Sequence, residues 1–299
     1  MGQFTYSDGV ATGKLVYYIP ALVASILVAS RHGFRKSSGW IYLTIFCVIR
    51  IVGSVAQLIL ISNPSSDGAS TTALICTVLG LAPLLLASLG LLARCYYSIL
   101  KQPWSTVFSL FGLRAVQILP TVGLILSIVG ATNANTAAEI DKQDTVKIGV
   151  VLFTVSFASI CLLCGIASLL AKKTKGGEKR LIRAVAFALP FLLVRVIYSL
   201  VAMFGNRSDF SLGNGSTAAV TISLFMEVLE ECAVVLIYVF TGLKLPTVPV
   251  DADEDGVNLA CRSERGGFGS GKFGLFSLGA AVLGRATKKH NGYGDVQSR

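Results

Sequence analysis

Seven long apolar stretches dominate this sequence of 299 residues and constrain its fold more than any other feature. About 20 residues at 1.5 Å per residue are enough for a helix to cross the hydrocarbon core of a bilayer. The stretches are 14–30, 39–62, 72–94, 107–130, 147–171, 181–204 and 217–242. They predict an all-α protein in which residues 1–242 form a bundle of seven transmembrane helices.

The composition agrees with a membrane protein. Hydrophobic residues make up 53% of the chain and charged residues only 14%, about half of the usual charged fraction of a soluble domain. The net charge of +10 is typical of basic cytoplasmic loops. No basic stripe interleaved with aromatic residues is present, so we expect no nucleic-acid partner. The cysteines lie in apolar stretches or near the carboxyl terminus, which argues against disulfides.

The distribution of Lys and Arg between alternate loops predicts the orientation in the membrane. One set of loops carries basic residues, among them Arg31, Arg35 and the cluster in 172–183. The other set, 63–70, 131–144 and 205–216, carries almost none. The amino terminus is therefore predicted to be outside or lumenal and the carboxyl terminus cytosolic. For an enzyme with this topology we expect the endoplasmic reticulum or another endomembrane.

Two further segments carry local signals. Asn206 and Asn214 each begin an Asn-x-Ser sequon in a predicted outer loop, so both are predicted glycosylation sites. Residues 243–299 contain an acidic run at 251–255 and a Gly-rich run at 266–274. Such a composition cannot bury enough apolar surface to fold, which predicts a disordered cytosolic tail.

Ionisable side chains within the predicted spans are candidate functional residues, because hydrocarbon disfavours charge. Glu227, Glu230 and Glu231 follow each other at i, i+3 and i+4, so they share one arc of about 100° on a helix. Arg50 and Arg195 are expected at a similar depth. The remaining candidates for the same polar chamber are Arg114, Gln57, Gln117 and Tyr198.

This chamber has a structural and a functional interpretation. In the structural one, three arginines neutralise three glutamates and fix the register of the helices. In the functional one, three crowded carboxylates cannot all be ionised, so that at least one keeps its proton and acts as a general acid. The only histidines are His32 and His290, and no Asp-rich run lies in a span, so we expect neither a metal nor another cofactor.

The stretches 30–58 and 188–204, together with the Glu-bearing last span, resemble a large group of fungal seven-span membrane proteins over residues 1–245. Some fungal seven-span proteins of secondary metabolism are membrane-bound terpene cyclases of the ascofuranone, meroterpenoid type. The resemblance implies a cofactor-independent enzyme, an isomerase or lyase, that protonates an epoxide or alkene on a prenyl chain.

In that enzyme, Glu227 or Glu231 is expected to be the acid and Glu230 its partner or the counter-charge of the carbocation. Arg50 and Arg195 are expected to control the protonation of the carboxylates and the helix register. The substrate would be a lipophilic prenylated small molecule that enters from the lipid bilayer. The alternative is a non-enzymatic seven-helix receptor or interaction protein that signals through its cytosolic tail.

Overall fold

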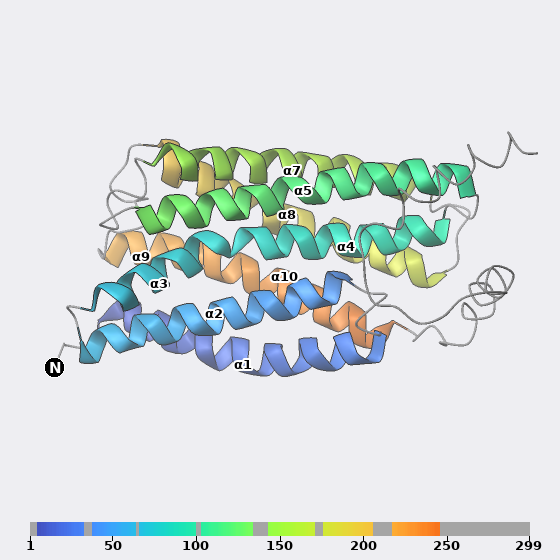
Figure 1. Ribbon diagram of the computed structural model, residues 1–299. Helices are drawn as coiled ribbons and strands as arrows, with labels where there is room; N and C mark the ends of the chain where they lie inside the picture. Colours follow the sequence, from blue (N-terminus) through green and yellow to red (C-terminus); the bar gives the residue numbers. More distant parts are fainter. Residues whose placement is uncertain are drawn as a thin grey trace, which may run out of the picture. The chain divides into compact units, whose positions relative to one another are not determined.

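The computed structural model describes residues 5–32, 38–63, 66–99, 103–133, 143–170, 176–205 and 217–245. Within these ranges all regular structure is helical, as predicted. Residues 1–247 form one compact unit, in which the helices run alongside one another as a bundle (Figure 1). The predicted tail beyond Leu245, the two sequons at Asn206 and Asn214, and Arg35 lie outside the described residues.

The helices follow the predicted apolar stretches with two interruptions. In chain order they are α1 (Tyr6–His32), α2 (Ser38–Ser62), α3 (Asp67–Leu79), α4 (Leu81–Ile99), α5 (Pro103–Asn133), α7 (Asp144–Leu170), α8 (Gly176–Phe204), α9 (Thr217–Ser223), a π-helical segment (Leu224–Val228) and α10 (Leu229–Lys244). The third predicted span is broken at Gly80, and the last is broken by the π-helical segment.

Six stretches of helix among the described residues are long and apolar enough to cross a membrane, and α3 and α4 together make one of them. Length and composition thus identify the chain as a multi-pass membrane protein. The last predicted span is helical from Thr217 to Lys244, but it is divided into three pieces and carries three glutamates. A count of seven spans therefore stays a prediction, and α10 extends beyond the predicted boundary at 242.

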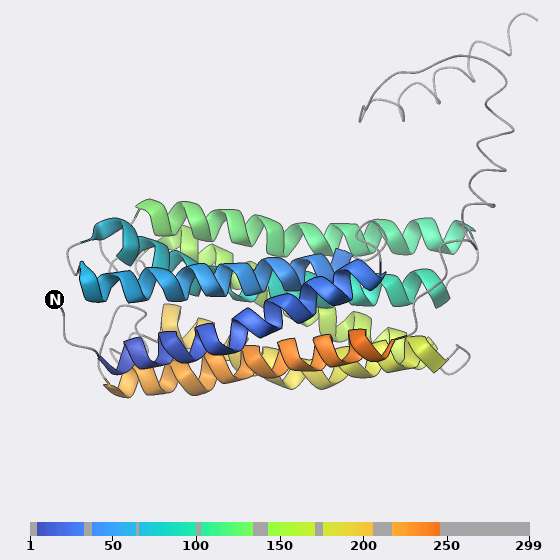
Figure 2. The same cartoon turned by 90° about the horizontal axis from the view of Figure 1, so that it is seen from below.

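Helix α4 is the central helix of the bundle, and it contacts α2, α5, α7 and α8. Its residues from Leu81 to Leu92 are buried without interruption. Around it, α1 packs on α2, α5 on α7, and α10 on α8. Figure 2 shows α1 from below, lying alongside α2 and α10. This order brings the first two helices next to the last one, so residues from the two ends of the domain share an interior.

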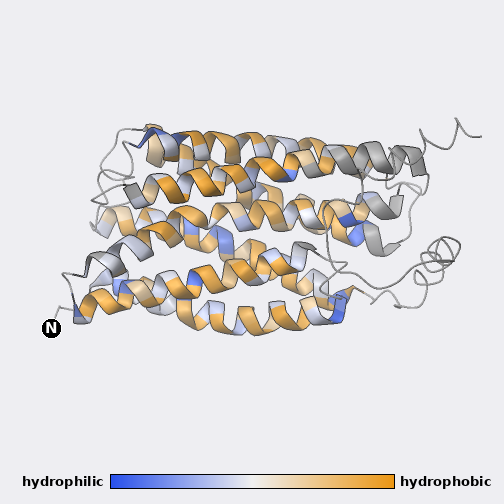
Figure 3. Ribbon diagram, in the orientation of Figure 1, coloured by the Kyte–Doolittle hydropathy of each residue, from blue (hydrophilic) through white to orange (hydrophobic). Residues whose placement is uncertain are grey.

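The outward faces of the helices are apolar as well. Val16, Leu162, Leu169 and Phe187 are all at least two-thirds exposed, and Figure 3 shows apolar residues along most of the length of the helices. A bilayer solvates such faces, so the usual division into an apolar interior and a polar surface does not apply. Buried charges are the exception among the described residues, and apart from Asp8 in the first turn of α1 they lie close together.

Candidate functional site

A charge cluster of four residues lies between α2, α8 and residues 217–244, the last helical stretch, which comprises α9, the π-helical segment and α10. Glu227, in the π-helical segment, and Glu231, in α10, have side chains that are only 2% and 1% exposed. Arg50 from α2 contacts both carboxylates, with its Nη2 2.9 Å from Glu227 Oε1 and also bonded to Glu231 Oε1. Arg195 from α8 contacts both as well, at 3.4 Å from Glu227 and 3.0 Å from Glu231.

Arg195 and Glu231 have further polar partners, as a buried charge requires, whereas Arg50 Nε is buried without a hydrogen-bond partner among the described residues. Arg195 donates through Nη2 to the Thr77 carbonyl oxygen at 3.2 Å and through Nη1 to Ser199 Oγ at 3.1 Å. The Tyr18 hydroxyl donates to Glu231 Oε2 at 3.5 Å. The guanidinium of Arg195 also lies 5.7 Å from the centre of the Tyr198 ring, a favourable cation–π distance.

The π-helical segment positions the first of the two carboxylates. The Leu229 amide donates to the Leu224 carbonyl oxygen, which is a bond between residues i and i−5. Such a segment adds one residue to a turn and changes the direction of the side chains that follow, and it is frequent at functional sites. Here it separates α9 from α10 at the depth where Glu227 meets the two arginines.

Gly80 makes room for the Arg50 guanidinium on the opposite side of the cluster. A Cβ atom at position 80 would lie 2.7 Å from Arg50 Cζ and 2.9 Å from Glu231 Oε1, and closer still to Arg50 Nη2. Its backbone is in the right-handed helical region, with φ of −56°. The glycine is therefore needed for close approach to the charges rather than for an unusual conformation.

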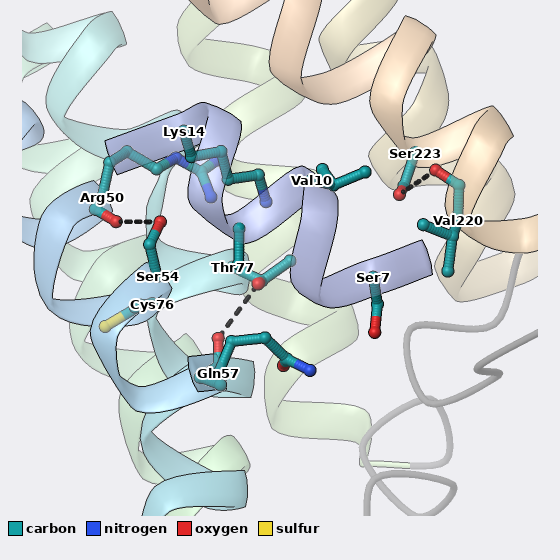
Figure 4. A pocket seen from close by; sticks show the side chains of 13 residues that line it. Ser7, Val10, Lys14, Arg50, Ser54, Gln57, Cys76, Thr77, Val220 and Ser223 are labelled. Carbon is teal, nitrogen blue, oxygen red and sulfur yellow. Dashed lines mark hydrogen bonds between the residues drawn. The ribbon is translucent and has the colours of Figure 1, made fainter. Parts of the chain in front are cut away.

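A pocket of about 120 Å³ opens beside the cluster, between α1, α2, α3 and α9. Figure 4 shows Arg50 and Lys14 side by side at one end of it. The other polar side chains lining it are Ser7, Ser54, Gln57, Thr77 and Ser223. The pocket therefore offers one guanidinium, one ammonium and several neutral hydrogen-bonding groups to a bound molecule.

Lys14 adds a third cation to the site. Its ammonium interacts electrostatically with both carboxylates and both guanidinium groups of the cluster. Two arginines and two glutamates cancel formally, so a protonated Lys14 gives these five residues a net formal charge of +1. In the part of the chain that the structure describes, Lys14 has no carboxylate within ion-pair distance, whereas Lys147 in α7 pairs with Asp144 at 3.6 Å.

An open groove of about 610 Å³ lies between α1 and the last helical stretch. Gly13, Tyr17, Leu224 and Val228 are among the residues that line it, and most of its lining is apolar. Val10 and Lys14 line both this groove and the pocket. Val10 and Lys14 of α1 therefore separate the pocket, which has polar lining residues, from the apolar groove.

The sequence-predicted residues divide into three groups. Glu227, Glu231, Arg50 and Arg195 come together in the cluster, Gln57 lines the pocket, and Tyr198 contacts Arg195. Gln117 lies on α5 and is not among the described residues lining the pocket. Arg114 also belongs to α5, but its side chain lies outside the described part of the structure.

Glu230 differs from the two glutamates beside it. Within the described ranges it makes no ion pair, and its Oε2 atom is buried without a hydrogen-bond partner. The expected set of three arginines and three glutamates is therefore replaced by two of each among the described side chains. The same ranges contain no convergence of three His, Cys, Asp or Glu side chains suited to a metal ion.

Sequence reasoning missed three residues of the site. In the sequence, Lys14 is the first residue of the apolar stretch 14–30, and Gly80 and Thr77 lie inside the stretch 72–94. Two signals for these residues were available in the sequence: Gly80 is a glycine inside an apolar stretch, and Lys14 is a lysine at the start of one. No sequence signal identifies the carbonyl oxygen of Thr77. This backbone atom accepts a hydrogen bond from Arg195 near the helix break at Gly80, and the break cannot be read from the sequence.

The comparisons with known proteins give one match. A family model described as "Domain of unknown function (DUF7702)" matches residues 4–248. The matched segment includes all six apolar helical stretches, the charge cluster and the pocket. No curated protein and no solved structure matches the chain.

Proposed function

The chain belongs to the DUF7702 family, whose description names no activity, and from the site itself we propose a function. We propose that the membrane domain binds a lipophilic molecule with an acidic head group. One observation carries this proposal. Lys14 is a third cation beside a cluster with only two carboxylates, and it borders both the pocket and the apolar groove.

Charge balance favours an anionic ligand. Arg50 and Arg195 already share the two carboxylates, so the positive charge of Lys14 is left uncompensated by the described residues. An unpaired cation within a membrane segment is unfavourable, and a carboxylate or phosphate bound next to Lys14 removes that penalty. The hydroxyl groups of Ser54 and Thr77 and the amide of Gln57 supply neutral partners for the same head group.

The two volumes favour an amphipathic ligand. A cavity of about 120 Å³ is smaller than the usual site for a whole drug-sized molecule, roughly 300–1,000 Å³, so it suits a head group only. The groove of about 610 Å³ on the other side of Lys14 suits an apolar body. Such a ligand would enter from the bilayer between α1 and the last helical stretch, in keeping with the lateral entry expected from the sequence.

This proposal corresponds to the alternative of a non-enzymatic receptor or interaction protein. In it, residues 217–244 form the seventh span, the carboxyl-terminal tail is cytosolic, and ligand binding beside Arg50 and Glu227 is transmitted through α8 and α10. The contacts that would carry the signal are those of the cluster itself, because it joins α2, α8 and α10.

A prenyl-cyclising enzyme is the second candidate, and Glu230 is the observation that favours it. A general acid must carry a proton before the reaction. Glu227 and Glu231 each contact two guanidinium groups, an arrangement suited to ionised carboxylates. Glu230 has no such partner among the described residues, so in a cyclase of this structure we propose Glu230 as the acid instead of Glu227 or Glu231.

Binding of a fluorescent long-chain carboxylate tests the main proposal. The full-length chain in lipid nanodiscs is titrated with this probe and with the alcohol of the same chain length. We expect Lys14→Met to weaken carboxylate binding about tenfold or more, since a hydrogen bond to a charged group contributes about 1.5–3 kcal/mol, and to leave alcohol binding unchanged. Lys147→Met, which removes a lysine already paired on α7, serves as the matched control.

Two results would contradict it. Equal affinity for the carboxylate and the alcohol would remove the role of the head group, and equal losses from Lys14→Met and Lys147→Met would remove the role of the pocket. The cyclase candidate has a separate test with a prenyl epoxide as substrate. It requires product from the native chain and none from Glu230→Gln, with both proteins equally well folded.

A further inference from the structure

A third cavity, a hollow away from the charge cluster, combines three cations with aromatic rings. It has a volume of about 350 Å³ and lies between the first turns of α8 and the last turns of α10. Figures 1 and 2 both show the start of α8 and the end of α10 at the same end of the bundle. By the distribution of basic loops, this end is the one predicted to face the cytosol.

The cations come from both helices and face one space. Arg180 and Arg183 of α8 and Lys244 of α10 are all exposed and line the hollow. Arg183 uses its Nε to donate to the Lys179 carbonyl oxygen at 3.3 Å, which holds the guanidinium group near the helix and leaves its terminal nitrogens for another partner. Among the described residues lining the hollow there is no carboxylate.

Aromatic side chains also line the hollow. Phe187 is 68% exposed and Phe240 is 56% exposed, and Phe191 lines the same space. The ammonium of Lys244 lies 4.0 Å from the centre of the Phe240 ring, a cation–π contact that directs the charge over the hollow. The arrangement places apolar surface toward the middle of the bundle and positive charge toward its end, which matches a lipid with its head group at the interface.

We propose that this hollow binds the head group of an anionic phospholipid of the adjoining leaflet, with its acyl chains along Phe187 and Phe240. Isolated basic residues at a membrane boundary extend individually toward the head groups. Here cations from two different helices converge on one hollow instead, as in the basic pockets between transmembrane helices that hold phosphoinositides. The site is separate from the Lys14 pocket, so it does not depend on the function proposed there.

Lipid-dependent native mass spectrometry tests the proposal. The full-length chain is extracted from vesicles of phosphatidylcholine with a minor fraction of phosphatidylinositol 4-phosphate, and bound lipids are identified and counted. We expect one retained phosphoinositide, with affinity reduced about fivefold for each cation removed in Arg180→Ala, Arg183→Ala and Lys244→Ala. Arg31→Ala is the matched control, because Arg31 is exposed at the end of α1 and does not line the hollow.

A pair of substitutions separates a binding site from general attraction to a charged surface. Phe187→Ala with Phe240→Ala keeps every charge but removes two of the aromatic side chains, and we expect it to weaken phosphoinositide retention while phosphatidylcholine retention stays unchanged. Equal losses from Arg31→Ala and Arg183→Ala would overturn the proposal. A second result would also overturn it: the lipid binds only when the acidic residues at 251–255 are neutralised. That result would mean that the acidic run, rather than a lipid, occupies the hollow in the native chain.

Discussion

Two helix contacts in this domain are built in opposite ways. Between α5 and α7 the helices approach through glycine: a Cβ atom at Gly149 would lie 2.9 Å from the Gly123 carbonyl oxygen, and one at Gly123 would lie 2.9 Å from the Phe153 ring. Between α2, α8 and α10 the contact is the charge cluster of Arg50, Arg195 and two glutamates. We refer to the first as the glycine contact.

The difference shows what each contact specifies. Lipid solvates apolar side chains as well as a neighbouring helix does, so helices associate through close packing and polar bonds. The glycine contact supplies close packing, and Phe153 of this contact lines a small cavity of about 20 Å³ among the described residues, which Arg195 and Ser199 also border. The charge cluster supplies polar bonds, and its Arg50 also lines a pocket. We therefore assign function to the cluster side of the domain.

The largest effect is expected from breaking the cluster on one side only. Arg50→Gln leaves Glu227 and Glu231 with Arg195 alone, and removing one partner of a buried ion pair destabilises a protein by about 3–5 kcal/mol. Thermal unfolding of the purified chain in detergent measures the loss. A double variant with Glu227→Gln should recover much of it, and equal instability of the double and single variants would show that pairing is not the cause.

The second prediction concerns a larger side chain at the glycine contact. Gly149→Val places side-chain atoms where the α5 backbone now lies, and overpacking of this kind destabilises by about 1–3 kcal/mol. Gly165→Val on the same helix is the matched control, because nothing lies within 4 Å of a Cβ atom there. If both variants unfold at the same temperature, α5 and α7 do not approach as closely as described.

The third prediction tests whether Gly80 serves the cluster. Gly80→Ala puts a methyl group against the Arg50 guanidinium, so we expect destabilisation of about 1–3 kcal/mol. The effect should shrink in an Arg50→Gln background, since the clashing group is gone and the two substitutions are not additive. Additive losses would mean that Gly80 acts on something other than Arg50.

The smallest effect on stability is expected at Lys14. Lys14→Met removes a charge that has no ion-pair partner among the described residues, so the unfolding temperature should stay the same or rise slightly. Ligand binding, in contrast, should fall as stated above. A loss of stability as large as that of Arg50→Gln would make Lys14 a structural member of the cluster and weaken its assignment to a ligand.

The sequence was informative about the helices and about which charges meet. Apolar length located the six helical stretches that can cross a membrane, and the cost of charge in hydrocarbon was enough to single out Arg50, Arg195 and the glutamates. It was less informative about pairing. Glu227, Glu230 and Glu231 share an arc on an ideal helix, but in the structure Glu227 lies in a π-helical segment that no spacing rule predicts. Glu230 makes no ion pair among the described residues.

The pocket could not be predicted for a related reason. Its lining comes from α1, α2, α3 and α9, so it depends on which helices are neighbours and on the break at Gly80. Hydropathy gives the helices but not their order in space, and α1 lies beside α10 although the two are separated by almost the whole domain. The role of Lys14 therefore depends on the packing of α1 against its neighbours, which hydropathy does not give.

Photolabelling with a long-chain carboxylate that carries a diazirine on its chain tests the central claim most directly. With the full-length chain in nanodiscs, mass spectrometry locates the labelled peptides. The account predicts labels on α1 around Val10 to Tyr17 and on 224–232, lost in Lys14→Met but kept in Lys147→Met. Labels spread evenly over the lipid-facing helices, including α7 beside the glycine contact, or labels that persist in Lys14→Met, would contradict it.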